Sequence, residues 1–527
     1  MNTTLFQTLR GLLTPPADAR NHHAAPAYAL SPRAALAQLA ATGCLTPTFY
    51  ASAETQLDEV LALAAQVDAE YVARVAVAAR EQGYMKDMPA LLAAHLATRD
   101  TALLERVFPR VIDSGRMLRT FVQILRSGAV GRKSLGSAPK RMVRDWLAGR
   151  SDAALFRASV GTTPSLADII KMVHPRPTTD ARRALYGYLI GRDHVADDLP
   201  EIVRAYEATK ADPARAAADG TIPDVPFQML ASLPFDSKVT ERAVWAEIAR
   251  TAPWHATRMN LNAFARHGAF AEPGVAETVA MRLADPESVR RARAFPYQLF
   301  MAYRQVSADV PHVVKEALQD AMEVAIGNVP RLGGRVVVCP DVSGSMLSPV
   351  TGYRRGATSA VRCIDVAALV AASVLRTNPS ARVLPFETRV VDVALNGRDS
   401  VLTNAAKLAA VGGGGTDCSA PLARLNAETA EVDLVFLVSD NESWVDAGNP
   451  RYGTGTMREW NRLKARNPGA KLVCLDMQPH RTVQAAPRAD VLHVGGFSDR
   501  VFEVVAAFAA GTLGADHWVG QIEAISI

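Results

Sequence analysis

The sequence contains few cysteines, and their spacing forms no recognisable pair. The five cysteines, at positions 44, 339, 363, 418 and 474, are scattered over 527 residues without a CxxC motif. This spacing excludes a disulfide framework and indicates no cysteine-based zinc site. We therefore expect the protein to function in a reducing compartment, and we predict the cytoplasm.

Long hydrophobic runs are also missing. A membrane-spanning helix needs about 18 consecutive apolar residues, and the nearest candidate, VAALVAASVL at 366–375, is short and is followed directly by Arg376. The amino-terminal stretch MNTTLFQTLRGLL has no basic region followed by an apolar block and a small-residue cleavage site, which such export signals require. The sequence predicts neither a membrane span nor an export signal.

Familiar catalytic motifs are absent as well. Neither HExxH nor GxSxG occurs, and no pair of carboxylates is placed for acid–base catalysis. The segment GRKS resembles the end of a phosphate-binding loop, but Arg132 occupies the position where that motif requires glycine. The glycines at 412–415 do not match the GxGxxG spacing either. We therefore predict that the protein is not an enzyme.

Positive charge is concentrated in one part of the chain. The formal net charge is +5, yet residues 101–150 alone contain eleven Lys or Arg and three Asp or Glu, a local excess of eight. A concentrated basic patch attracts polyanions more strongly than the same charge spread evenly. This segment is therefore the first candidate for a nucleic-acid interface.

The chain divides into a helical part and a part that alternates strands with helices. From about residue 30 to 325, apolar residues recur at helical spacing, as at Val72, Val75, Ala76 and Ala79. Short polar connections between such helices suggest stacked hairpins of the HEAT type, although no clean repeat period is visible. Gly and Pro residues at 327–338 mark a boundary. We predict a helical HEAT-like domain over 1–330 and a second domain over 331–527.

The second domain is predicted to contain a doubly wound parallel sheet. Its candidate strands are short, apolar and rich in β-branched residues, and they alternate with helical segments. They are RVVVCP 335–340, ARVLPF 381–386, DLVFLV 433–438, KLVCLD 471–476 and DVLHVG 490–495. Ligands of such sheets bind at the carboxyl ends of the strands, near the point where the strand order reverses.

Three polar segments are predicted to meet at that edge. DVSGS 341–345 follows the first strand, GGGGTD 412–417 precedes a helix, and LVSD 437–440 ends a central strand. Their carboxylate and hydroxyl oxygens suit Mg²⁺ or another divalent cation, which prefers oxygen ligands. The candidate ligands are Asp341, Ser343, Ser345, Thr416 and Asp440. With so few charged ligands, the ion would keep affinity for an acidic residue of a protein partner.

Together these segments resemble the von Willebrand factor A fold and its metal-ion-dependent adhesion site. Two other interpretations stay open. In one, Asp341 caps the following turn and Asp440 caps a helix, without any metal. In the other, the site forms but contributes only to stability.

The cations of the basic segment are arranged in a pattern. Along one predicted helix, arginines flank an apolar stripe, and a Gly/Ser-bearing loop and a second basic helix follow. The candidate RNA-binding residues in this segment are Arg116, Arg119, Arg126, Arg132, Lys133, Lys140, Arg141 and Arg144. Phosphate contacts by such a surface give an affinity that falls steeply with salt. The alternative is a solvated helix face, but the scarcity of acidic counterparts within the segment favours nucleic-acid binding.

Several segments together resemble the Ro autoantigen family, which carries the TROVE module. They are GYMKDMPALLAAHLA 83–97, VQILRSGAVGRKSLGSAPKRMVRDWL 122–147, ADIIKMVHPRP 167–177, RARAFPYQLFMAY 291–303 and VSDNESW 438–444. The resemblance implies a ring of HEAT-like repeats closed by the A-type domain. It also implies binding of small Y RNAs on the basic outer surface and of single-stranded 3′ ends of misfolded RNA in the hole. In bacterial members the Y RNA can tether an exoribonuclease.

The resemblance also assigns residues. His174 matches the family's Y-RNA histidine, with Lys171 and Arg157 on the same surface, and Lys140 and Arg141 match a basic pair. This chain departs from the family there, because KSLGSAP lengthens the segment between Arg132 and Lys140. The residues alone favour a core or capping role for His174.

We therefore predict a non-enzymatic, cytoplasmic RNA-binding protein of the Ro type, with Mg²⁺ in the A-type domain and a monomeric ring. The rival interpretation is a metal-dependent protein-interaction scaffold in which RNA binding is incidental.

Overall fold

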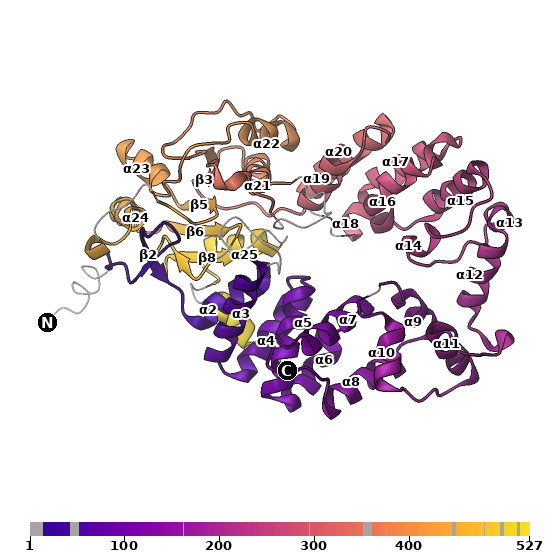
Figure 1. The fold of residues 1–527 in the computed structure, drawn as a ribbon. Helices are drawn as coiled ribbons and strands as arrows, with labels where there is room; N and C mark the ends of the chain where they lie inside the picture. Colours follow the sequence, from indigo (N-terminus) through magenta and orange to yellow (C-terminus); the bar gives the residue numbers. More distant parts are fainter. Residues whose placement is uncertain are drawn as a thin grey trace. The chain divides into compact units, whose positions relative to one another are not determined.

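The computed structural model describes residues 14–42, 52–161, 163–292, 294, 296–350, 361–444, 450–478, 480–495, 500–513 and 517–527. These residues form two compact units, whose elements are labelled in Figure 1. The helical unit comprises Asp68–Ser288, Val306–Leu318 and Ser526–Ile527. The sheet unit comprises the described parts of Met1–Val67, Val289–Gln305 and Gln319–Ile525. The compact units thus divide the chain differently from the predicted boundary at residue 330, because segments far apart in sequence pack together.

The helical unit consists of stacked, mostly short helices. They are α4 (Ala69–Glu81), α5 (Asp87–Arg99), α6 (Thr101–Val111), α7 (Gly115–Ser127), α8 (Ser137–Ala148), α9 (Asp152–Ala158), α10 (Leu166–Val173), α11 (Asp180–Ile190), α12 (Glu201–Ala211), α13 (Pro213–Ala218), α14 (Phe227–Leu230), α15 (Lys238–Thr251), α16 (Trp254–Arg266) and α17 (Val275–Ala284). Consecutive helices pack against one another, as α4 does against α5 and α5 against α6. The predicted repeat-like helical architecture is confirmed.

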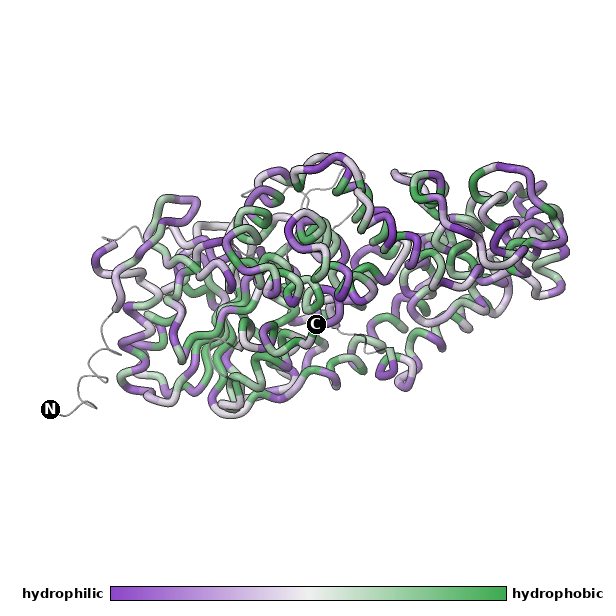
Figure 2. The backbone as a smooth tube through the Cα atoms, turned by 90° about the horizontal axis from the view of Figure 1, so that it is seen from below, coloured by the Kyte–Doolittle hydropathy of each residue, from purple (hydrophilic) through white to green (hydrophobic). Residues whose placement is uncertain are grey.

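Local sequence explains where these helices begin and end. The side chain of Asp100 accepts hydrogen bonds from the first free N–H groups of α6, and Ser165 forms a capping box with Asp168 at the start of α10. Gly128 ends α7 with a φ of 93°, a left-handed conformation that glycine adopts without strain. The predicted apolar face of α4 is buried, including Val72 and Val75. Figure 2 shows how hydrophobic and hydrophilic residues alternate along the helices.

The sheet unit is built on a five-stranded parallel sheet. Its strands are β3 (Val336–Pro340), β4 (Arg382–Val383), β5 (Leu434–Ser439), β6 (Lys471–Asp476) and β8 (Val491–Gly495), in the order β4-β3-β5-β6-β8. From β3 the chain continues to β4 on one side of the sheet, whereas from β5 it continues to β6 on the opposite side. The direction in which strands are added therefore reverses between β3 and β5. The predicted doubly wound sheet is confirmed, with strand positions close to those expected.

Helices cover both faces of this sheet. The helices of the sheet unit are α2 (Pro32–Thr42), α3 (Ala53–Gln66), α19 (Pro296–Gln305), α21 (Cys363–Thr377), α22 (Val401–Ala409), α23 (Ala420–Ala427), α24 (Gly455–Arg466), α25 (Arg500–Ala509) and α26 (His517–Glu523). α18 (Pro286–Arg291) and α20 (His312–Ile326) contribute residues to both units. On one face, Leu422 of α23 and Trp460 of α24 join Val435 and Leu472 in a continuous apolar core. α21 packs against β3.

A second, small sheet was not predicted. β1 (Ala19–Arg20) pairs antiparallel with β2 (Pro26–Ala29), and β2 pairs antiparallel with β7 (Thr482–Val483). The pairing joins Tyr28 to Val483, and the Tyr28 side chain lies in the apolar core of the sheet unit. An amino-terminal segment is thereby part of the sheet unit.

The described residues include no helix that combines the length and the apolar character needed to cross a membrane. Four of the five cysteines fall in the described part and are buried, whereas Cys44 lies outside it.

Candidate metal site and nucleic-acid interface

The first candidate site lies at the carboxyl ends of β3 and β5. These parallel neighbours are in register, with Pro340 opposite Val438, so that Asp341 and Asp440 follow at the same edge of the sheet. The backbone N–H of Asp341 donates to the carbonyl of Val438 at 2.8 Å. The sheet therefore places both predicted acidic ligands at the point where the strand order reverses, as expected for this fold.

The carboxylate of Asp341 is fully buried and held by two hydrogen bonds. Its Oδ1 accepts from the backbone N–H of Ser343 at 2.8 Å, and its Oδ2 accepts from the hydroxyl of Ser439 at 2.5 Å. Burial, followed by the neighbouring carboxylate of Asp440, raises the pKa of Asp341 to about 7. Two buried carboxylates in this relationship repel each other, and a bound cation would offset that repulsion.

The glycine run brings Thr416 to the same place. Gly413 and Gly414 have φ values of 141° and 76°, in the region that favours glycine. Backbone hydrogen bonds tie this loop to the loop after β3, from Gly344 to the carbonyl of Gly414 and from Gly413 to the carbonyl of Val342. A Cβ atom on Gly415 would lie 2.4 Å from the Trp444 ring, so this position also requires glycine.

The donor set fits a hard divalent cation. The buried side chains of Ser343 and Thr416 add hydroxyl oxygens, and the Ser343 hydroxyl lies 3.3 Å from that of Ser345, which is half-buried. Oxygen donors of this kind, two of them carboxylates, are what Mg²⁺ binds in proteins.

The two carboxylates also cap turns. Each accepts a backbone N–H two residues ahead, Asp341 from Ser343 and Asp440 from Glu442 at 3.4 Å. The turn-capping alternative for Asp341 is therefore correct in part. The helix cap proposed for Asp440 is wrong, because residues 441–444 are not helical.

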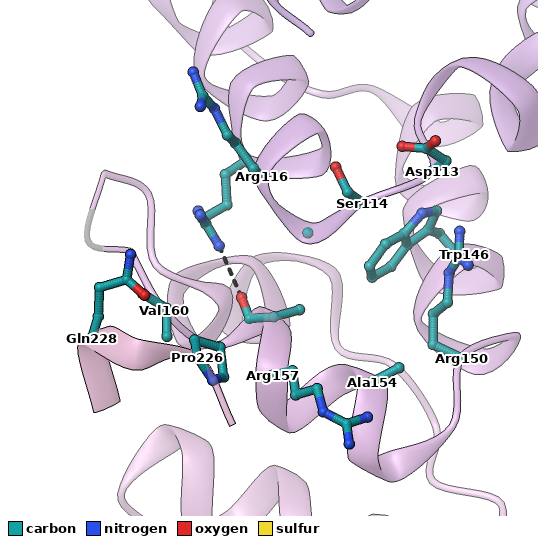
Figure 3. Close-up of a pocket in the computed structure, with 13 residues that line it drawn as sticks. Asp113, Ser114, Arg116, Trp146, Arg150, Ala154, Arg157, Val160, Pro226 and Gln228 are labelled. Atoms are coloured by element: carbon teal, nitrogen blue, oxygen red, sulfur yellow. Dashed lines mark hydrogen bonds between the residues drawn. The ribbon is translucent and has the colours of Figure 1, made fainter. Parts of the chain in front are cut away.

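The second candidate site is a cavity of about 430 Å³ in the helical unit. It lies among α7, α8 and α9, and four arginines line it, as Figure 3 shows around the labelled Arg116, Arg150 and Arg157. The cationic part of the lining consists of Arg116, Arg119, Arg150 and Arg157, which lie near Trp146. The acidic lining residue Asp113 forms an ion pair with Arg80 at 2.7 Å, which offsets its charge. The cavity is thus strongly cationic.

Packing and hydrogen bonds hold the arginines of the cavity in place. Arg119 donates from Nη1 to the carbonyl of Ala158 at 2.8 Å, and burial, followed by the charge of Arg116, lowers the pKa of Arg119. The guanidinium of Arg150 stacks over the Trp146 ring at 4.8 Å from its centre. Trp146 is itself fixed, because its indole N–H donates to the carbonyl of Ile112 at 2.6 Å. Arginine heads held in this way are suited to binding phosphate.

The other predicted RNA-binding residues lie outside the cavity. Arg126 and Lys171 both help lower the pKa of Asp168, after its hydrogen bonds with Ser165, which places them near one another. Arg144 donates to the carbonyl of Val173. His174 ends α10 in the left-handed conformation and is exposed, which confirms the capping role and contradicts the core role.

The loop between α7 and α8 carries the remaining basic residues. Arg132 donates to the carbonyl of Ala97 at 3.0 Å, and Lys133 is exposed. Lys140 is half-buried on α8, and Arg141 forms an exposed ion pair with Glu105 at 2.8 Å.

The expected scarcity of acidic counterparts is wrong in part. Arg157 pairs with Asp224 at 2.9 Å, and Arg116 lies 3.6 Å from Asp87. Asp87 lies outside residues 101–150, so a count within that segment missed it, and the pair of Arg157 and Asp224 lies wholly outside the segment. The side chain of Asp224 is 86 % exposed, and such surface pairs contribute only about 0–1 kcal/mol. A phosphate can replace them at little cost.

Comparison with known proteins finds two family models along the chain. The model of the Ro60 von Willebrand factor A domain matches residues 335–509, and the model of the TROVE domain matches residues 234–364. An RNA-binding protein RO60 of Deinococcus radiodurans is 27% identical over 93% of this chain and 95% of its own length. The chain therefore carries segments that match the TROVE and Ro60 von Willebrand factor A domain models, and it is similar to an RNA-binding protein RO60 along almost its whole length.

Two further comparisons define the extent of the likeness. An RNA-binding protein RO60 of Caenorhabditis elegans is 26% identical over 53% of this chain and 43% of its own length. The crystal structure of the Deinococcus radiodurans RO (RSR) protein superposes with a TM-score of 0.65 at 24% identity, covering 92% of this chain and all of that one. This last likeness shows the shared fold.

The lengthened KSLGSAP segment forms the loop before α8 and the first turn of that helix. A Cβ atom on Gly136, which has a φ of 73°, would lie 2.3 Å from the guanidinium of Arg132. The loop is therefore packed onto one of the predicted basic residues.

Sequence reasoning missed two residues that the structure adds to the sites. Arg150 counted toward the local charge, and its spacing of four residues from Trp146, which brings the two side chains together at the end of α8, is the signal that could have revealed it. Ser439 is the last residue of β5, and its hydrogen bond to Asp341 spans 98 positions. Its position directly before Asp440 is the signal that could have revealed it.

Proposed function

We propose that this protein binds RNA through the helical unit, without cleaving it. The observation that carries the proposal is the cavity that Arg116, Arg119, Arg150 and Arg157 line. Similarity to the Ro family supports it, because the relatives from Deinococcus radiodurans and Caenorhabditis elegans are named RNA-binding proteins.

The arginines would bind backbone phosphates. Arg119 is held in place by the carbonyl of Ala158, so little side-chain freedom is lost on binding. Arg157 would exchange its exposed partner Asp224 for a phosphate. Phosphate contacts carry no sequence information, so recognition depends on RNA shape and on unpaired ends.

The proposed RNAs are small, structured non-coding RNAs of the Y type and misfolded RNAs with single-stranded 3′ ends. The exposed His174 and Lys171 belong to the proposed surface for the structured RNA. An exoribonuclease that acts on the bound RNA is the proposed protein partner, and a monomeric ring is the proposed assembly. The cytoplasmic location stays a prediction.

In the sheet unit, Asp341, Ser343, Ser345, Thr416 and Asp440 would hold Mg²⁺. The ion would supply an open coordination position for an acidic residue of a partner protein. Asp341 and Asp440 would balance its charge, and the hydroxyls would orient it.

The test is fluorescence anisotropy with a structured RNA that carries a single-stranded 3′ tail. Binding should weaken with salt, and Arg150→Glu combined with Arg157→Glu, which reverses two arginines that line the cavity, should weaken it further. The matched control is Arg183→Glu, which reverses an exposed arginine of the same unit on α11. Unchanged binding in the double variant, or RNA shortened in the presence of Mg²⁺, would contradict the proposal.

A second candidate function is a metal-dependent scaffold that binds a protein partner. The observation in its favour is the ligand arrangement around Asp341 and Asp440. If Asp341→Ala abolishes RNA binding while the fold survives, the binding depends on the sheet unit and not on the helical unit alone.

A further inference from the structure

Three side chains from distant parts of the sheet unit converge beside the loop that follows β5. They are His22, Glu442 and His480, and one potential ligand atom from each lies within 4.8 Å of the others. Nδ1 of His22 lies 3.0 Å from Oε1 of Glu442, and the rings of His22 and His480 are 4.6 Å apart at an angle of 65°. Two imidazoles and one carboxylate thus face a common point.

Backbone pairing fixes the segments that carry these residues. His22 lies in the turn between β1 and β2, and His480 lies two residues before β7, to which β2 is paired. Asn21 locks the turn, because its Oδ1 accepts from the backbone N–H groups of His23 and Ala25. Its Nδ2 donates to the carbonyl of Ser443 at 2.6 Å, which holds the turn against the loop that contains Glu442.

The carboxylate of Glu442 is aimed by a second contact. Its Oε2 accepts from the backbone N–H of His22 at 3.1 Å, which leaves Oε1 facing the two imidazoles. Glu442 is fully buried and His480 is 8 % exposed, whereas the side chain of His22 is 39 % exposed. The cluster is closed on the protein side and open to water on the side of His22.

This ligand set differs in kind from the oxygen set around Asp341. Imidazole nitrogens favour Zn²⁺ over Mg²⁺, and sites with two histidines and one glutamate hold Zn²⁺ with a water as fourth ligand. Zn–N and Zn–O bonds of about 2.0–2.2 Å place the ligand atoms of a tetrahedral site about 3.3–3.6 Å apart. The three ligand atoms lie within 4.8 Å of one another, so a small approach would bring them to a common ion. Glu442 follows Asp440 by two residues, so the two sites share one loop.

We propose that His22, Glu442 and His480 bind one Zn²⁺ ion, which fastens the amino-terminal hairpin to the loop after β5. The role is structural. The ion joins three segments, and those that carry His22 and Glu442 are more than 400 positions apart in the sequence. The proposal does not depend on RNA binding, since all three residues belong to the sheet unit.

The test uses the full-length protein, stripped with a chelator and titrated with Zn²⁺ in competition with a chromophoric chelator. We expect one Zn²⁺ per chain and a Zn²⁺-dependent rise in Tm. Loss of a residue that only hydrogen-bonds to a metal ligand already weakens metal binding by about 10–100-fold. His22 is proposed as a ligand itself, so His22→Gln should weaken Zn²⁺ binding by at least about 100-fold. Because the His22 side chain is partly exposed, this variant is expected to fold.

Two control variants make the result specific. His23→Gln changes the adjacent exposed histidine, which is not in the cluster, and should bind Zn²⁺ as the wild type does. Asp341→Asn should also retain Zn²⁺. Co²⁺ provides a second readout, since intense visible bands report four-coordinate geometry and should disappear in His22→Gln.

The proposal is overturned if the wild type binds no Zn²⁺ or if His22→Gln binds it equally well. It is also overturned if Asp341→Asn, rather than His22→Gln, loses the ion.

Discussion

The guanidinium group of Arg119 occupies the space that the side chain of any residue larger than Gly161 would fill. A Cβ atom on Gly161 would lie 2.6 Å from Nη2 of Arg119, and Gly161 has a φ of 118°. The absence of a side chain at this position therefore allows Arg119 to reach the carbonyl of Ala158 and line the cavity.

Gly161→Ala should weaken RNA binding by displacing Arg119. The backbone strain should cost about 1–3 kcal/mol of unfolding free energy, and loss of one charged contact should lower affinity by about tenfold. Anisotropy and thermal melting measure the two effects. Gly220→Ala is the control: it places alanine at a φ of 64° with no atom within 4 Å, so it should lose stability without losing RNA affinity.

Asp341→Asn should abolish stabilisation by Mg²⁺ without destabilising the metal-free protein. Replacing one of two neighbouring buried carboxylates removes their repulsion. Differential scanning fluorimetry with and without Mg²⁺ checks this, because a ligand at 100 times its Kd stabilises by about 2.7 kcal/mol. Equal Mg²⁺-dependent shifts in the wild type and the variant would place the ion elsewhere.

Gly415→Ala should disturb the same site from the glycine loop. Its Cβ atom would lie 2.4 Å from Cζ2 of Trp444, so the loop must move and carry Thr416 with it. The Mg²⁺-dependent rise in Tm should therefore shrink. Trp444 is 47 % exposed, and the double variant Gly415→Ala/Trp444→Ala should recover the Mg²⁺ effect. A double variant as defective as Gly415→Ala alone would show that the ring is not the cause.

The main features of the sheet could be predicted because they are local in sequence. β3, β5, β6 and β8 each form a short apolar run, and the carboxyl ends of parallel strands necessarily share one edge. The proximity of Asp341 and Asp440 follows from that rule.

The small sheet could not be predicted in this way. β1 and β2 have only two and four residues, with no β-branched pattern, and the partner of Tyr28 is Val483. The cluster of His22, Glu442 and His480 depends on this pairing, so no motif spacing reveals it. Pairings of this kind follow from tertiary packing alone.

The candidate nucleic-acid interface was predicted in composition but not in geometry. Charge counting selected Arg116 and Arg119, and the resemblance added Arg157, which lines the same cavity. The ion pair of Arg157 with Asp224 crosses 67 positions and is invisible in a local count.

The most direct measurement of the central claim is the salt dependence of RNA binding in the wild type and in Arg116→Ala/Arg150→Ala/Arg157→Ala. Each phosphate contact contributes about 0.7–0.9 to the slope of log Kobs against log salt concentration. The account predicts that the triple variant binds more weakly and that its slope is smaller by about 2–3. A variant with the wild-type affinity and slope would show that the arginine cavity does not bind RNA.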